Sequence, residues 1–167
     1  MSVPGVIAAG FCVMPSFEAE ATLPYPREQV FEFLLRPANV AQISPPGLGL
    51  HFVDPPEVVE QGTRLKFRVQ GFGQIRESEH EITTLTPHSF VLERQIKGLF
   101  QKWHHEHLFE TAPNGQTRII DRIDFSPPGG VLGLLVTAQR VLDQLEEAFE
   151  DRHDRLSRLL ARHAKQG

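Results

Sequence analysis

Apolar and polar residues alternate with a period of two over residues 17–23, as expected for a strand that buries one face. Pro26 follows, at a position where a helix can begin, and apolar residues then recur at helical spacing. We therefore expect a short helix after Pro26. A second short helix is predicted for residues 37–43, because the proline- and glycine-containing cluster at residues 44–47 cannot continue a helix.

Alternating segments continue over residues 48–125 and predict six further strands. The connections between them are short, so neighbouring strands must be antiparallel, because a parallel crossover needs a dozen or more residues. We expect a meander. The turn signals are Pro55-Pro56, Gly62, Gly71-Phe72-Gly73, Thr86-Pro87, Gly98 and Asn114-Gly115.

The period changes after residues 127–130, where apolar residues begin to recur every three to four positions. This predicts one amphipathic helix, from Leu135 to about His163, on the order of 45 Å long. Its apolar stripe would cover the concave face of the sheet, although the stripe also fits the heptad of a coiled coil. The stripe consists of Leu135, Ala138, Leu142, Leu145, Phe149, Leu156 and Leu160.

These elements predict an α+β fold in one domain over residues 16–164. A curved seven-stranded antiparallel sheet would wrap around the long C-terminal helix, with two short helices between the first and second strands. A chain of 167 residues is long enough to bury one stable core. Residues 1–15 lack the basic start and the long apolar run of a secretory signal. We expect them to be a disordered lead, with Met14 as a candidate natural start.

Charge and cysteine content narrow the partners and the compartment. The net charge is −4 with both signs interspersed, so no basic stripe is available for nucleic acid. The single cysteine, Cys12, cannot form an internal disulfide, which fits a reduced, cytoplasmic location. No run of apolar residues reaches the roughly 18 needed to cross a bilayer, so we expect no integral membrane segment.

Two local motifs add to this picture. The segment at residues 89–98 is followed by the pattern Trp103-x-His105-x-His107-x-Phe109. Residues 116–129 resemble the pattern Gly-Thr-x-x-x-Asp-x-Val-x-Tyr-x-x-Pro-x-Gly, with departures that include Gln116 and Phe125 in place of its glycine and tyrosine. Together with the order of elements, they resemble the polyketide cyclase/dehydrase-like, ligand-binding branch of the SRPBCC (START-like) superfamily. The resemblance implies a helix-grip fold with a cavity between sheet and helix. It does not specify an activity, because the fold hosts lipid carriers, cyclases and other functions.

His105 and His107 share one face of a predicted strand with Trp103 and Phe109. If that face lines the cavity, the imidazoles can hydrogen-bond a polar group of a ligand or transfer a proton near neutral pH. Alternatively, they form a structural pair with nearby carboxylates or lie on the outer face of the sheet. Zinc is a third alternative, but the candidate third ligands lack the spacing of a metal motif, and we assign no metal. Those candidates are Asp121, Glu93 and His104.

The connection at Asn114 and Gly115 determines which carboxylate faces the histidines. A two-residue loop places His107 opposite Arg122, whereas a three-residue loop with a bulge places it opposite Asp121. We favour the three-residue loop because it collects the apolar residues on one face. It aligns Trp103 with Phe125 and Phe109 with Ile119.

Polar residues occur on both faces of the strand at residues 90–97. Glu93 and Gln95 share one face, and Arg94 lies on the other. A buried carboxylate needs a partner, so Glu93 either pairs with a group such as a histidine or faces solvent. We favour the solvent-facing arrangement.

The leading hypothesis is that the cavity binds a small hydrophobic molecule, such as a lipid or polyketide. An alternative is a cofactor-free cyclase or dehydratase in which His105 or His107 is the general base and Asp121 orients it. A third is a protein-interaction domain, for example a homodimer. We expect no cofactor, because the motifs for nucleotide binding, serine hydrolysis and thiol redox chemistry are missing from the sequence. The predicted ligand-contacting residues are Glu93, Gln95, Trp103, His105, His107, Phe109, Asp121, Ile123, Phe125 and Leu142.

Overall fold

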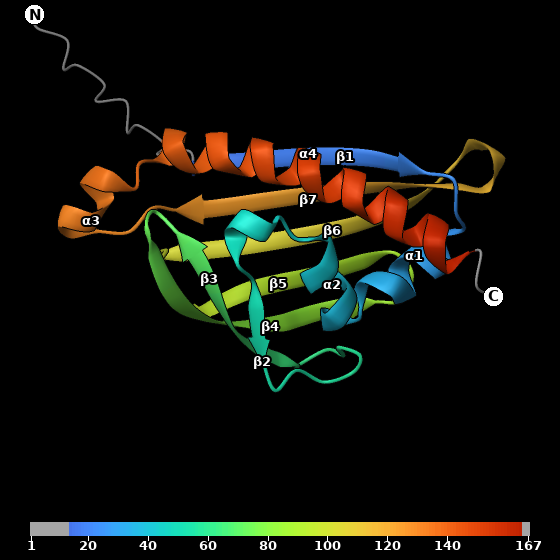
Figure 1. Ribbon diagram of the computed structural model, residues 1–167, viewed down its shortest axis with the longest axis horizontal. Coiled ribbons are helices and arrows are strands. Elements are labelled where there is room, and N and C mark those ends of the chain that lie inside the picture. The colour runs from blue at the N-terminus through green and yellow to red at the C-terminus, as the bar shows by residue number, and fades with distance from the viewer. Residues whose placement is uncertain (1–13, 165–167) are drawn as a thin grey trace, which may run out of the picture.

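The computed structural model describes residues 14–164, so residues 1–13 of the predicted lead lie outside the described residues. Its strands form one curved, antiparallel sheet (Figure 1). The strands are β1 (Ser16–Leu23), β2 (His51–Val53), β3 (Arg64–Gly71), β4 (Gln74–Thr86), β5 (Phe90–Lys97), β6 (Lys102–Ala112) and β7 (Gln116–Ser126). Their order in the sheet is β1-β7-β6-β5-β4-β3-β2. The predicted seven-stranded meander is confirmed, with β1 pairing beside β7 at one edge.

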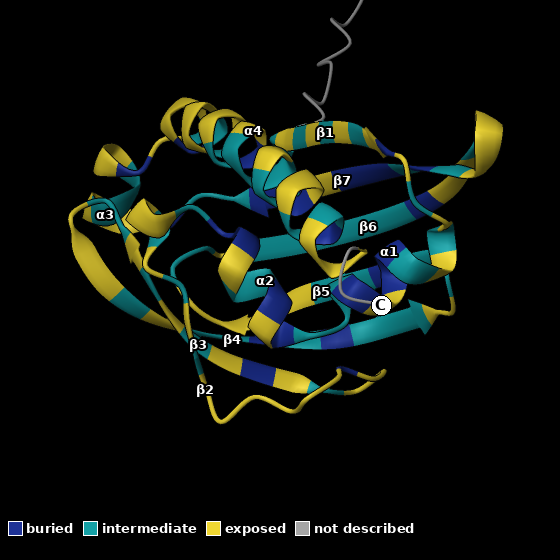
Figure 2. Cartoon of the chain, turned by 45° about the vertical axis from the view of Figure 1, so that its right-hand side comes forward, coloured by how far each residue is buried: buried dark blue, intermediate teal, exposed yellow. Residues whose placement is uncertain are grey.

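Helices cover the concave face of this sheet (Figure 1). The two short helices predicted between the first strands are α1 (Arg27–Leu34) and α2 (Pro37–Ile43). They are followed by a 3-10 turn, η1 (Pro46–Leu48). After β7 come α3 (Gly130–Leu135) and the long α4 (Ala138–His163). The face of α4 that points away from the sheet is exposed, whereas the face toward the sheet is buried or half-buried (Figure 2).

The prediction of one uninterrupted helix from Leu135 was wrong at its start. Helix α3 ends at Leu135, and α4 begins after Thr137, whose hydroxyl accepts a hydrogen bond from the backbone N–H of Arg140 at 3.4 Å. This is an N-cap, which starts a new helix. Leu135 is 59% exposed and does not join the buried stripe. The rest of the stripe packs inside this chain, which leaves the coiled-coil alternative unsupported.

The connection between β6 and β7 has three residues, η2 (Pro113–Gly115). Asn114 and Gly115 have φ angles of 62° and 71°, which asparagine and glycine tolerate better than other residues. The loop therefore gives the favoured register. His107 lies opposite Asp121, and Trp103 and Phe109 lie opposite Phe125 and Ile119.

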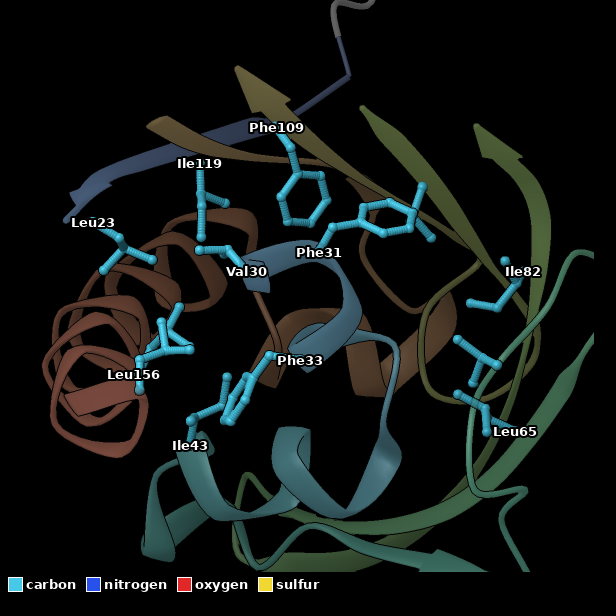
Figure 3. Close-up of a cluster of buried hydrophobic side chains, with 13 residues drawn as sticks. Leu23, Val30, Phe31, Phe33, Ile43, Leu65, Ile82, Phe109, Ile119 and Leu156 are labelled. Carbon is cyan, nitrogen blue, oxygen red and sulfur yellow. The ribbon is translucent and has the colours of Figure 1, made fainter. Parts of the chain in front are cut away.

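The buried apolar side chains form two clusters. The larger one fills the interior between α1, the C-terminal half of α4 and the sheet (Figure 3). Leu156 of α4 is only 1% exposed and packs in this cluster with Val30 and Ile43. The smaller cluster lies under the first half of α4 and contains Ile123, Phe125, Val136, Val141 and Phe149. Within residues 14–164, no helix is both long enough and apolar enough to span a membrane.

Candidate functional site

A cavity of about 340 Å³ lies between the inner face of the sheet, α2 and the first half of α4. Apolar side chains from strands and helices make up most of its lining, including Phe52, Phe67, Val69, Leu145 and Ala148. The lining stops at Arg152 along α4, so residues 153–163 of that helix take no part. At the other end, Phe72, Leu99 and Phe100 contribute to the lining from the β3–β4 and β5–β6 connections.

The structure brings most of the sequence-predicted site residues to this cavity. Those that line it are Glu93, Gln95, Trp103, His105, His107, Phe109 and Ile123. Three predicted residues do not line it. Asp121 lies behind the two histidines, and Phe125 is fully buried beside Trp103, with ring centroids 6.0 Å apart. Leu142 lines a separate groove together with Phe17 of β1.

Asp121 holds both histidines. Its Oδ1 accepts hydrogen bonds from Nε2 of His105 at 3.0 Å and from Nδ1 of His107 at 2.7 Å. The two imidazole rings lie against each other, with centroids 3.8 Å apart. An ionised carboxylate only accepts hydrogen bonds, so the ring nitrogens that face Asp121 carry the protons. In the neutral rings, Nδ1 of His105 and Nε2 of His107 are therefore the free acceptors.

Burial and hydrogen bonding set the charges of this group. Burial alone would raise the pKa of Asp121, but the hydrogen bonds from His105 and His107 lower that pKa well below its usual range. Burial and the neighbouring His107 lower the pKa of His105 to about 4, against the opposing effect of Asp121. At neutral pH the cluster thus contains a carboxylate and at least one neutral imidazole.

Glu93 lines the cavity and is paired, not solvent-facing as the favoured interpretation of the sequence had it. Nδ1 of His80, on the neighbouring strand β4, donates a hydrogen bond to Oε1 of Glu93. Burial would raise the pKa of Glu93, yet this hydrogen bond and the charge of His80 lower it to about 2. Glu93 is also the residue directly opposite His105 across the β5–β6 ladder. Glu93, His105 and His107 thus form one polar wall of a mostly apolar cavity.

Comparison with known proteins gives matches among solved structures. No family model matches the chain, and no curated protein matches it in sequence. The Zhui aromatase/cyclase from Streptomyces sp. R1128 is 20% identical with a TM-score of 0.68, covering 90% of this chain and 96% of that one. Protein Ms6760 from Mycobacterium smegmatis is 16% identical with a TM-score of 0.67, covering 88% and 91%. Ara h 8.0201 is 17% identical with a TM-score of 0.55, covering 84% and 96%.

Each of these structures superposes on most of this chain. The chain has the helix-grip fold. The resemblance found in the sequence is confirmed at the level of the fold. At these identities the likeness shows the fold alone.

Two histidines near this helix-grip cavity were missed in the sequence. His80 is buried on β4 and donates a hydrogen bond to Glu93. The alternation of apolar and polar residues along that strand places His80 on its inward face, and this was the sequence signal that could have identified it. His153 of α4 has its Nε2 3.7 Å from Oδ2 of Asp121, which is too long for a hydrogen bond. Among the described residues, this buried Nε2 has no hydrogen-bond partner. Only the packing of α4 on the sheet brings His153 to Asp121.

The arrangement of the site supports two kinds of interaction with a small molecule. The free ring nitrogens of His105 and His107 can accept a hydrogen bond or a proton from a polar group, while Asp121 fixes the orientation of both rings. The apolar side chains that make up most of the lining can enclose hydrocarbon or aromatic surface.

Proposed function

We propose that the chain binds a small, mostly apolar molecule whose polar group contacts the wall of Glu93, His105 and His107. The observation that carries this proposal is the interior cavity, whose volume of about 340 Å³ falls at the lower end of the range typical of small-molecule sites, about 300–1,000 Å³. Such sites combine an apolar lining with a few polar groups that orient the ligand. The arrangement here follows that pattern.

The polar wall defines what the bound molecule must offer. Glu93 is charged and accepts hydrogen bonds, and the outward nitrogens of neutral His105 and His107 are acceptors as well. A hydroxyl, phenol or amine donor satisfies these groups, whereas a pure hydrocarbon leaves them without partners and loses affinity. We therefore expect amphipathic ligands with a donor at one end to bind more tightly than alkanes of equal size.

A fluorescence titration with a dye that reports apolar sites tests this function. The probe is 1-anilinonaphthalene-8-sulfonate, whose emission rises in an apolar site. Ala148 lines the cavity from α4, so Ala148→Phe should fill the space and lower probe affinity at least about tenfold, equivalent to about 1.4 kcal/mol. Ser157→Phe adds the same ring at an exposed position of the same helix and serves as the matched control.

Wild-type affinity in Ser157→Phe together with loss in Ala148→Phe places the probe in the cavity. Equal affinity in all three proteins would show that the probe binds elsewhere and would contradict the proposal. Circular dichroism spectra of the two variants establish that both retain their helix and strand content.

A second candidate function is acid–base catalysis on the bound molecule by a cofactor-free cyclase or dehydratase. The sharing of Asp121 by His105 and His107 favours it, because a carboxylate that orients an imidazole is a common feature of general-base sites. The likeness to the Zhui aromatase/cyclase points the same way. A molecule that co-purifies with His107→Gln should stay unconverted on that variant and should be converted when wild-type protein is added. No conversion by the wild type would end this second candidate.

A further inference from the structure

We propose that Glu93, His105 and His107 bind a divalent transition-metal ion at the polar wall of the cavity. Each residue offers one donor atom, and these atoms all lie within 4.8 Å of one another. The β5–β6 pairing brings them together, because Glu93 lies opposite His105 and His107 follows on the same face of β6. This inference goes beyond ligand binding and does not rest on it.

Each of the three donors is already held by an outer partner. Asp121 accepts the N–H groups of both imidazoles, at 3.0 Å from His105 and 2.7 Å from His107. His80 holds the carboxylate of Glu93. Metal-binding histidines in proteins almost always donate their second ring N–H to a carboxylate, carbonyl or water, and metal-binding carboxylates are hydrogen-bonded in turn. The structure thus contains this outer shell as well as the three donors.

The structure also selects among the third ligands considered from the sequence. His104 lies on the opposite face of β6 and does not line the cavity. The Oδ1 of Asp121 is shared by the two histidines from behind, away from the cavity. Glu93 is the candidate whose donor atom lies near those of both histidines, and all three residues line the cavity.

The donor set identifies the class of metal. Two imidazole nitrogens and one carboxylate suit Zn²⁺ and other first-row transition metals, whereas Mg²⁺ and Ca²⁺ prefer oxygen ligands. Three protein ligands leave a fourth tetrahedral position, which is typical of catalytic zinc sites. Because all three residues line the cavity, the fourth position faces the space in which a small molecule would lie.

Isothermal titration of the chelator-treated, full-length protein with Zn²⁺ tests the assignment. We expect one ion per chain, and we expect Co²⁺ to give the intense visible absorption of a four-coordinate ion. Glu93→Gln and His107→Gln should each weaken Zn²⁺ binding by more than about 100-fold, and Asp121→Asn by about 10–100-fold, the usual cost of an outer-shell change. Glu93→Gln keeps an acceptor oxygen for His80, so this variant should remain folded.

His104→Gln is the matched control, since it removes a histidine from the same strand but not from the proposed site, and it should bind Zn²⁺ as the wild type does. Thermal unfolding of the metal-free variants verifies that each one is folded. The proposal is overturned if the wild type shows no saturable binding of one ion, or if Glu93→Gln and His107→Gln bind as tightly as His104→Gln. Probe binding by the metal-free wild type is measured separately, so a failed metal site and a failed ligand cavity are distinguishable.

Discussion

The two halves of α4 cover different interiors. Its C-terminal half places Leu156 and Leu160 among the side chains of α1 and the sheet, and both leucines are almost fully buried. We call this region the filled end. The first half places Leu145 and Ala148 over the cavity, opposite the polar wall of Glu93, His105 and His107. We call this region the hollow end.

The comparison shows that one amphipathic pattern supports both packing and binding. The apolar stripe has the same spacing over the filled end and the hollow end, but beneath the hollow end the smaller buried cluster leaves a cavity. At the filled end, α1 supplies those partners, including Val30 and Phe31 (Figure 3). At the hollow end the polar and aromatic side chains of the sheet line the cavity together with Leu145 and Ala148. Stability is therefore expected to depend on the filled end and function on the hollow end.

The largest difference between the two ends should appear on truncating leucines of α4. Leu156→Ala removes a side chain from the filled end and should lower the free energy of unfolding by about 2–5 kcal/mol. Leu145 is half-buried and already lines the cavity, so Leu145→Ala merely enlarges existing space. This change should cost about 1 kcal/mol or less. Urea unfolding of both variants measures this, and equal losses would contradict the distinction between the ends.

Acid should lower the stability of the protein through His105, which lies at the hollow end. The pKa of His105 is about 4 in the folded chain against about 6.5 for an unperturbed histidine, so the unfolded chain binds more protons between these values. The free energy of unfolding should therefore fall as the pH drops from about 6.5 to 4, by about 3 kcal/mol from this group. Urea unfolding at several pH values measures the slope. His105→Gln should flatten it, whereas Leu156→Ala should lower stability equally at every pH; identical slopes in wild type and His105→Gln would refute the assignment.

The shared carboxylate gives a somewhat smaller effect. Asp121→Asn replaces the charged acceptor of His105 and His107 with a neutral amide in a site that is 3% exposed. Hydrogen bonds to charged groups contribute about 1.5–3 kcal/mol, so the variant should lose about 1–3 kcal/mol of stability. Thermal and urea unfolding measure the loss. A variant as stable as the wild type would mean that Asp121 does not hold the histidines.

Adding volume should destabilise the filled end more than the hollow end. Val30→Phe overpacks the filled end and should cost about 1–3 kcal/mol. Ala148→Phe enters empty space and should change stability by less than about 1 kcal/mol, the smallest effect predicted here. Urea unfolding of the two variants provides the measurement, and a larger loss for Ala148→Phe than for Val30→Phe would indicate that the hollow end is already filled.

Most of the fold was predictable because it follows from local patterns. Period-two alternation located the strands, and proline positions located α1 and α2. The apolar residues of β6 and β7 selected the three-residue loop that pairs His107 with Asp121. The break between α3 and α4 was missed because Leu135 fits the spacing of the stripe, although Thr137 carried an N-cap signal.

The site was predictable only in part, because its contacts join distant segments. His105, His107 and Asp121 lie on paired strands, so register alone brings them together. The partnership of Glu93 with His80 depends on the irregular β4–β5 ladder, whose register shifts alternation does not reveal. Leu142 belongs to the predicted stripe, but the stripe is wider than the cavity, and this residue lies toward β1.

Native mass spectrometry of the purified chain tests the central claim, that the hollow end encloses a small molecule, most directly. The wild type should carry a bound, mostly apolar molecule that dissociates on collisional activation, and Leu156→Ala, which alters the filled end, should carry it too. Ala148→Phe should appear at the mass of the bare chain. An Ala148→Phe protein that retains the same molecule as the wild type would contradict the account.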